Sequence, residues 1–233
     1  MVSLGQRGDV AVGVDVAEER KGLDLVALDS QRRIVASYGK LSVAAVAELV
    51  IDELKPSIVC VDSPPAFSLS ATTRQAERQL ARLGFPAFPV GPDPGDHPFF
   101  RWMRVGFRVF AAISEKYPLY RNGDPRGCAA EVFPNAAAVT ISGRRRRREE
   151  TKTSFRRAAL DAAGVAADRL PNLDRVDAAL AALSGLYALE GSFAALGDPD
   201  EGVVVIPKLL DGPLTSYPLP AATAPSAAER EAK

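Results

Sequence analysis

A run of apolar residues near the N-terminus carries a single acid inside it. Residues 9–17 read DVAVGVDVA, and Asp15 stands between Val14 and Val16. A nearly continuous apolar run of this length is typical of a strand that is buried on both faces, which requires a sheet covered by helices. An ionised carboxylate in such surroundings is costly unless a cation meets it. Asp15 is therefore the first candidate for a functional residue.

The segments that follow predict a mixed α/β sheet. Two short strands at 22–30 and 32–40 are joined by a polar turn, and an amphipathic helix at 42–56 leads to a β-branched strand at 57–65 that ends at a pair of prolines. The hairpin predicts antiparallel pairing, and the helical crossover predicts parallel pairing after it. Further strands are predicted at 128–134 and 201–207, and further helices at 72–84, 98–117, 151–164 and 172–191.

The domain organisation predicted from these segments is simple. The chain has 233 residues and contains no internal repeat and no clean linker. We expect a single domain over residues 1–217, with a helical insertion at about 68–127 after the fourth strand. The Ala-, Pro- and Glu-rich segment 218–233 has no apolar periodicity and is predicted to be a disordered tail.

Composition narrows the class of protein. Lys plus Arg and Asp plus Glu both total 29, so attraction to nucleic acid must come from local clusters of charge. No segment reaches the ~18 apolar residues of a membrane span, and the first residues lack the apolar core of a signal peptide. We interpret Cys60 and Cys128, both in apolar runs, as buried thiols. Together these features predict a cytoplasmic protein without a membrane partner.

Four more acids are predicted to lie near Asp15. Asp62 ends the strand at 57–65, and ligands of crossover sheets bind outside the carboxyl ends of parallel strands, so Asp15 and Asp62 should emerge at the same edge. Glu131 lies in the strand at 128–134. Asp174 and Asp177 are three residues apart, on one face of a helix.

Each acid also has a purely structural explanation. Asp15 could pair with Lys21 or with backbone N–H groups, and Asp62, which precedes Ser-Pro-Pro, could form a turn. Asp174 could be a helix N-cap, with Asp177 completing a capping box.

As a set, these carboxylates indicate a metal site, because converging acids repel one another unless a divalent cation neutralises them. Ligands that are all oxygen favour Mg²⁺ or Mn²⁺. Two such ions ~4 Å apart can activate a water and stabilise the departing oxygen of a phosphodiester. The predicted metal ligands are Asp15, Asp62, Glu131, Asp174 and Asp177, and the predicted catalytic residues are Asp15, Asp62, Glu131 and Asp177.

Six segments spread over most of the chain carry a family resemblance. They are GVDVA at 13–17, VDSPPAF at 61–67, RQAERQL at 74–80, EVFPNAA at 131–137, DRVDAALAAL at 174–183 and EGVVVIP at 201–207. Together they resemble the predicted ribonuclease H-like nucleases known as domain of unknown function 429. The acidic step DRVDAA is also similar to the C-terminal acidic helix of Holliday-junction resolvases.

The resemblance implies a ribonuclease H-like fold: a mixed five-stranded sheet, with an antiparallel hairpin and parallel strands, flanked by helices. It also implies that Asp15, Asp62, Glu131 and Asp177, with Asp174 as a possible addition, bind metal.

Arginines form three basic clusters that could bind phosphate. Two are helical stripes, and the third is a loop with the basic residues that follow it: Arg74, Arg78 and Arg82; Arg101, Arg104 and Arg108; and Arg144–Arg148 followed by Lys152, Arg156 and Arg157. Such clusters are also found on solvated helix faces. The predicted substrate-binding residues are Arg74, Glu77 and Arg78, because they follow the Asp62 loop and lie in the RQAER motif. We expect Arg74 to hold a phosphate and Glu77 to orient it or a water.

The function predicted from the sequence is a divalent-metal-dependent nuclease that acts by a two-metal mechanism on nucleic acid of unspecified kind. One alternative is an ATP-dependent sugar-kinase or actin-like phosphotransferase. Such a site requires a Gly- and Thr-rich hairpin after the first acid, where this chain has Ala17, Glu18 and Glu19. The other alternative is a non-catalytic binding protein that keeps the acids for a structural ion.

Overall fold

The apolar run around Asp15 forms an inner strand of a mixed sheet. In the computed structural model, which describes residues 8–69 and 72–208, β1 (Val10–Asp15) lies between β2 (Leu23–Asp29), which is antiparallel to it, and β4 (Ile58–Asp62), which is parallel to it. β3 (Ile34–Leu41) pairs antiparallel with β2. The crossover from β3 to β4 is α1 (Val43–Glu48), capped by Ser42, and a π-helical turn, η1 (Leu49–Leu54). The predicted hairpin and crossover are both confirmed.

The other half of the sheet has more strands than predicted. β5 (Ala129–Val132) is parallel to β4, β7 (Gly202–Pro207) is parallel to β5, and β6 (Phe193–Asp198) pairs antiparallel with β7. The strand order is β3-β2-β1-β4-β5-β7-β6. The described residues thus form seven strands, where the resemblance implies five and the individual segments predict six, all except β6. The sequence of β6, FAALGD, has no β-branched residue and only one buried position, which is why it gives no strand signal.

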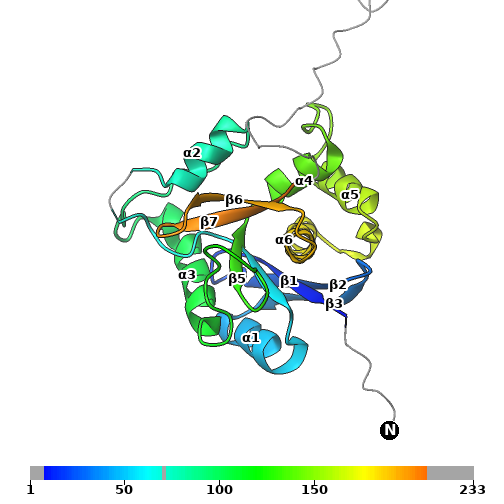
Figure 1. Ribbon diagram of the computed structural model, residues 1–233, viewed down its shortest axis with the longest axis horizontal. Helices are drawn as coiled ribbons and strands as arrows, with labels where there is room; N and C mark the ends of the chain where they lie inside the picture. The colour runs from blue at the N-terminus through cyan, green and yellow to red at the C-terminus, as the bar shows by residue number, and fades with distance from the viewer. Residues whose placement is uncertain (1–7, 70–71, 209–233) are drawn as a thin grey trace, which may run out of the picture.

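Helices cover both faces of this sheet (Figure 1). The remaining helices are α2 (Gln75–Arg82), η2 (Pro98–Phe100), α3 (Arg101–Ile113), α4 (Pro134–Ser142), α5 (Lys152–Ala162), η3 (Ala167–Arg169) and α6 (Leu173–Leu189). α1 and α3 pack on one face, against Val12, Val14 and Val61, and α6 packs on the other, against Ala11 and Cys60.

The predicted insertion at 68–127 contains α2 and α3, whereas the predicted tail at 218–233 lies outside the described residues. Cys60 is buried as predicted, but Cys128 is only partly buried. Among the helices of the described ranges, none combines the length and apolar character that a membrane crossing requires.

Two glycines allow α6 to lie directly on the sheet. A Cβ atom at Gly13 of β1 would lie 2.0 Å from the carbonyl oxygen of Ala178 and 2.3 Å from the backbone nitrogen of Ala182, both in α6. A Cβ atom at Gly185 of α6 would lie 2.8 Å from the Cys60 sulfur. Backbone contacts of this kind leave no room for a side chain, so the distance between helix and sheet is set by these two residues.

Replacing Gly13 by alanine is therefore expected to lower the free energy of unfolding by about 3 kcal/mol, because α6 must move away from β1. Urea denaturation measures this difference. Gly123→Ala is the control, since a Cβ there meets nothing within 4 Å and the only cost is a backbone φ of 78°. That strain is worth about 1 kcal/mol. Equal losses in the two variants would contradict the close approach of α6.

Candidate functional site

Asp15 and Asp62 lie side by side at the carboxyl ends of parallel strands. In the register of β1 and β4, Asp15 is directly opposite Asp62. Side chains alternate between the faces of a strand, so Asp15 is on the same face as Gly13, and Asp62 is on the same face as Cys60. Gly13 and Cys60 both face α6, and the two carboxyl groups therefore lie on the α6 face of the sheet.

The first turns of α6 supply the next two acids. The helix is capped by Asn172, whose side-chain oxygen accepts from the backbone N–H of Arg175 at 2.9 Å, so Asp174 is not the cap and lies in the first turn. Asp177 is only 5% exposed. Its Oδ2 pairs with Arg156 of α5 and lies 3.8 Å from the Lys152 Nζ. Its Oδ1 is buried and has no hydrogen-bond partner within the described ranges.

These acids repel one another strongly. Burial raises the pKa of Asp15 well above its usual value, and Asp62, Asp177, Asp174 and Asp24 raise it further. The pKa of Asp62 rises to about 7, mainly through burial and the charge of Asp177, although Arg156 and Lys152 lower it. The site therefore carries more negative charge than its own basic residues neutralise.

The donor chemistry of this acid cluster, defined here as Asp15, Asp62, Asp174 and Asp177, fits a divalent cation. The oxygens it offers to a metal are all carboxylate oxygens, and within residues 8–69 and 72–208 the buried Oδ1 of Asp177 has no hydrogen-bond donor. As the side chains stand, no three His, Cys, Asp or Glu residues of the described ranges are close enough to enclose an ion. Binding would therefore require the aspartate side chains to rotate toward one another.

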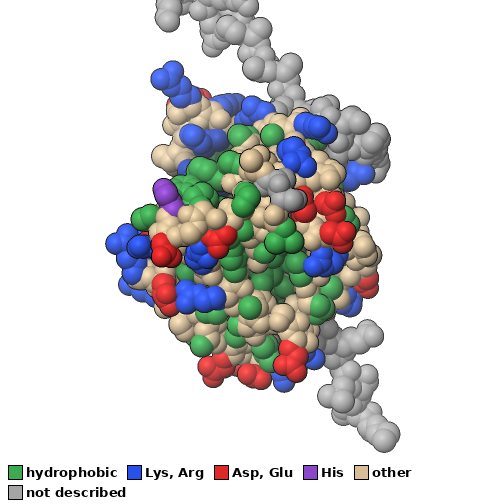
Figure 2. Space-filling view, turned by 90° about the vertical axis from the view of Figure 1, so that its left-hand side faces the viewer, with side chains coloured by type: hydrophobic (Ala, Val, Ile, Leu, Met, Phe, Trp, Pro, Cys, Tyr) green, Lys and Arg blue, Asp and Glu red, His purple; other side chains and the backbone are tan. Residues whose placement is uncertain are grey.

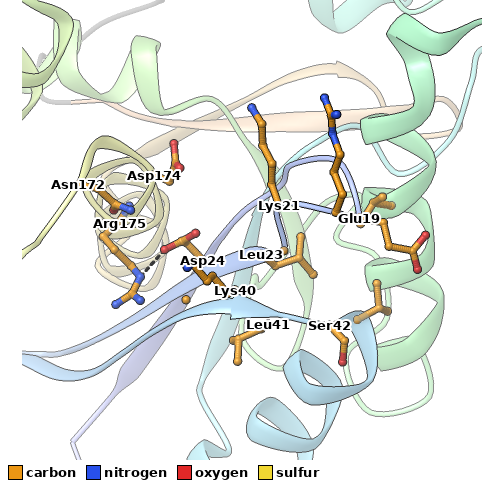
Figure 3. A pocket seen from close by; sticks show the side chains of 15 residues that line it. Glu19, Lys21, Leu23, Asp24, Lys40, Leu41, Ser42, Asn172, Asp174 and Arg175 are labelled. Atoms are coloured by element: carbon orange, nitrogen blue, oxygen red, sulfur yellow. Dashed lines mark hydrogen bonds and ion pairs between the residues drawn. The ribbon is translucent and has the colours of Figure 1, made fainter.

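A cleft of about 730 Å³ opens beside the acid cluster. It lies between α6, the start of β2, the end of β3 and the loop after β1, and Asp24, Asp174, Lys21 and Lys40 all line it (Figure 3). Asp24 is opposite Asp15 in the register and pairs with Arg175 of α6. Asp174 is the member of the acid cluster that lines the cleft, so the cleft reaches the cluster at Asp174.

Glu131 is the predicted ligand that the structure does not bring into the cluster. In the register of β4 and β5, Glu131 is opposite Val61 rather than Asp62, so its side chain lies on the opposite face from the aspartates. Both of its carboxylate oxygens accept from Arg74, at 2.7 and 2.8 Å. Burial nevertheless raises the pKa of Glu131.

Arg74 is buried rather than open to a substrate. It is 1% exposed, and its three guanidinium nitrogens donate to Glu131 and to Glu77, whose Oε1 accepts from Nε at 3.0 Å. This Glu77–Arg74–Glu131 triad replaces the phosphate contact expected of Arg74. Arg78 donates to the backbone oxygen of Thr73 at the surface.

Other basic residues of the predicted clusters form surface ion pairs. Arg104 pairs with Asp93, Arg108 with Glu19, and Arg144 with Glu150.

Sequence reasoning missed Asp24, and it named Arg156 as part of a basic cluster without its partner Asp177. Asp24 stands inside an apolar strand, as Asp15 does, and that signal could have identified it. The pairing of Arg156 with Asp177 joins two helices and has no counterpart in local sequence. Arg156 looks like any other member of the basic stretch around it.

The segments that carry the acid cluster also lie within a match to a known protein family. A family model described as a protein of unknown function, DUF429, matches residues 13–202. The chain belongs to the DUF429 family. The resemblance drawn from the sequence motifs is thereby confirmed, and the DUF429 match spans the strands and the helix that hold the acid cluster.

Among solved structures, this DUF429 chain is similar to Thermus thermophilus RuvC, with 16% identity and a TM-score of 0.43 over 78% of this chain and 96% of that one. The comparison with curated proteins gave no match.

Proposed function

We propose that this DUF429 protein hydrolyses phosphodiester bonds of nucleic acid with the help of a divalent cation, Mg²⁺ or Mn²⁺. The observation that supports this most is the surroundings of Asp15. Asp15 is partly buried, and the four charged neighbours that act on its pKa are all aspartates. Such an excess of carboxylate at the open end of parallel strands is suited to holding a cation where a substrate can reach it.

Three residues would form the seat for the cation. Asp15 and Asp62 present neighbouring carboxylates from backbones fixed by strand pairing, and Asp177 adds its Oδ1 from α6. Asp174 lies at the rim, where the cleft begins. A bound divalent cation would supply Lewis acidity, activating water and offsetting charge on the phosphate.

Basic residues around the seat would have two tasks. Arg156 and Lys152 hold Asp177 from the side of α5 and keep its Oδ1 oriented. Lys21 and Lys40 line the cleft and are placed to meet a phosphate group that approaches the aspartates. We assign the Glu77–Arg74–Glu131 triad no part in holding the cation.

The test is a cleavage assay over single-stranded, duplex, hybrid and branched DNA and RNA in Mg²⁺ or Mn²⁺. We expect Asp15→Asn to lower the cleavage rate by about a hundredfold or more, because one ligand and one charge are lost at the seat. The matched control is Asp52→Asn, which makes the same change at an exposed position of η1. The proposal fails if no substrate is cleaved with either ion, or if Asp15→Asn cleaves as fast as Asp52→Asn.

A further inference from the structure

A second cavity lies at the same edge of the sheet, beside Asp62. It has a volume of about 90 Å³ and is bounded by Phe88, Trp102 and Phe133, with Asp62, Glu77 and Glu131 among its lining residues. The walls are thus largely apolar, with three aromatic side chains among them, while carboxylates of the Glu77–Arg74–Glu131 triad contribute to the polar part. Neither the acid cluster nor the cleft beside α6 includes these aromatic residues.

Glu77, a lining residue of this cavity, carries an unused hydrogen-bond acceptor. The side chain is 4% exposed, and its Oε1 accepts two N–H groups from Arg74. Its Oε2 is buried and has no hydrogen-bond partner in the part of the chain that the structure describes. A buried carboxylate oxygen without a donor is unfavourable, so it marks a place where a ligand N–H would be held.

A metal ion does not fit this place. Arg74 already occupies the place between Glu77 and Glu131 and pairs with both carboxylates. No three acidic, His or Cys side chains of the described ranges converge closely enough here to enclose a cation. The ligand that suits the cavity is therefore a flat, largely apolar group with an N–H donor on its edge.

The entrance to the cavity is aromatic and exposed. Phe88, which lines the cavity, is 64% exposed, and it packs edge-on against Phe99, which is 44% exposed, with ring centroids 5.1 Å apart. Arg104 lies over the ring of Phe67 in the same cluster of aromatic side chains. Figure 2 views this side of the molecule, where hydrophobic side chains gather near the histidine with Lys and Arg beside them. Exposed aromatic rings next to basic residues are the features that stack nucleobases.

We propose that the cavity receives the edge of one unpaired nucleobase from the strand whose phosphate lies at the acid cluster. This inference rests on the proposed function, because it assigns the same site an unpaired nucleotide as its substrate. The cavity and the acid cluster adjoin at Asp62, at the end of β4, although Glu131 lies on the opposite face of the sheet from the aspartates. A strand that passes over the end of β4 would reach both. The amino or imino group of the base donates to Glu77 Oε2.

The size of the cavity decides how the base is held. A cavity that encloses a benzene ring measures ~150 Å³, so about 90 Å³ admits only the edge of a base. The rest of the ring stacks on Phe88 at the entrance. In a duplex this edge is paired and inaccessible, so duplex nucleic acid is excluded from the cavity.

Trp102 provides a direct reporter of occupancy, because it is the only tryptophan of the chain and lines the cavity. The experiment is a fluorescence titration in EDTA with a short single-stranded oligonucleotide, the same strand with abasic sites, and the same strand as a duplex. Free tryptophan in parallel titrations corrects for absorption by the bases. We expect saturable quenching by the intact single strand, and binding weaker by about fivefold or more for the other two.

Three variants complete the titration. Phe88→Ala, which changes an exposed ring, is expected to weaken binding of the intact strand by about fivefold or more, and Glu77→Gln should weaken it as well. Tyr38→Ala removes a 39% exposed ring on the edge strand β3, and binding should be unchanged. Equal quenching by intact and abasic strands, or unaltered binding by Phe88→Ala, would overturn the inference.

The cleavage assay separates this inference from the proposed function. Metal-dependent cleavage without saturable quenching of Trp102 refutes the base-binding cavity and leaves the nuclease in place. Saturable quenching without cleavage supports the cavity as a binding site for unpaired bases and refutes the nuclease.

Discussion

Replacing Arg74 by methionine is expected to lower the free energy of unfolding by about 3–5 kcal/mol. The guanidinium is 1% exposed and is the ion-pair partner of two carboxylates that are themselves buried, Glu77 and Glu131. Methionine is of similar length but leaves both acids without a cation. Removing one member of a buried ionic group is far more damaging than removing an exposed one, because the remaining charges stay in an apolar interior.

The loss of unfolding free energy in Arg74→Met should increase as pH rises. Burial already raises the pKa of Glu131 in the presence of Arg74, and removing the guanidinium raises it further. A carboxyl group whose pKa is higher in the folded state favours folding less as pH rises from its unfolded value, about 4.3, toward the folded value. The difference in unfolding free energy between the wild type and Arg74→Met should therefore be smaller near pH 4 and should grow toward pH 7.

Urea denaturation at several pH values measures this effect. The control is Arg126→Met, which removes an ion pair to Asp9 whose side chains are 48% and 35% exposed. That pair should be worth no more than about 1 kcal/mol. If Arg74→Met is no less stable than Arg126→Met, the buried triad does not stabilise the fold. Combining Arg74→Met with Glu131→Gln should recover part of the loss.

Asp62→Asn is expected to stabilise the metal-free protein near pH 8 and to abolish its stabilisation by Mn²⁺. The pKa of Asp62 is about 7 when the protein is folded, against 3.8 ordinarily. Between these values the folded state binds more protons than the unfolded state, so the stability of the wild type falls as pH rises from about 4 to about 7. The wild type loses about 1.4 kcal/mol of unfolding free energy for each pH unit in this range. Asp62→Asn has no carboxyl group at this position and therefore avoids a loss of a few kcal/mol.

Mn²⁺ should reverse this pH dependence in the wild type. A cation at the acid cluster replaces the protons that the aspartates would otherwise retain, so its stabilising effect is larger near pH 8 than near pH 5. Thermal melts with and without Mn²⁺ at the two pH values measure it. Asp52→Asn, the exposed control, should retain both the pH slope and the response to Mn²⁺. A wild type that melts at the same temperature with and without Mn²⁺ near pH 8 would contradict the proposed seat.

Strand pairing explains why most of the fold and part of the site could be predicted from the sequence. Asp15 and Asp62 are strand-end acids in apolar runs, and parallel pairing alone puts them together. Asp174 and Asp177 were identified by helical spacing, and the close contact of α6 with Gly13 brings their helix to the same edge.

The prediction that included Glu131 lacked the strand register. A displacement of one residue between β4 and β5 is invisible in sequence, yet it moves the side chain to the opposite face. Arg74 illustrates a second limit. An arginine in an amphipathic helix suggests a surface residue. Only the packing of α2 on β6 and β7, which brings Arg74 to Glu131 of β5, shows that it is enclosed by two acids. The strand β6 was missed because alanine and glycine carry little strand preference.

The seating of α6 on the sheet has a consequence for ion selectivity. Glycine and alanine have no side-chain torsions to adjust, so the helix cannot give way when a larger ion enters between it and the strands. The backbones that carry Asp15, Asp62 and Asp177 are therefore held at a fixed distance from one another. Only the short aspartate side chains can turn. A site of fixed width would suit a small ion with octahedral coordination, such as Mg²⁺. Ca²⁺ has longer metal–oxygen bonds and more ligands, and the site could not widen to accommodate it.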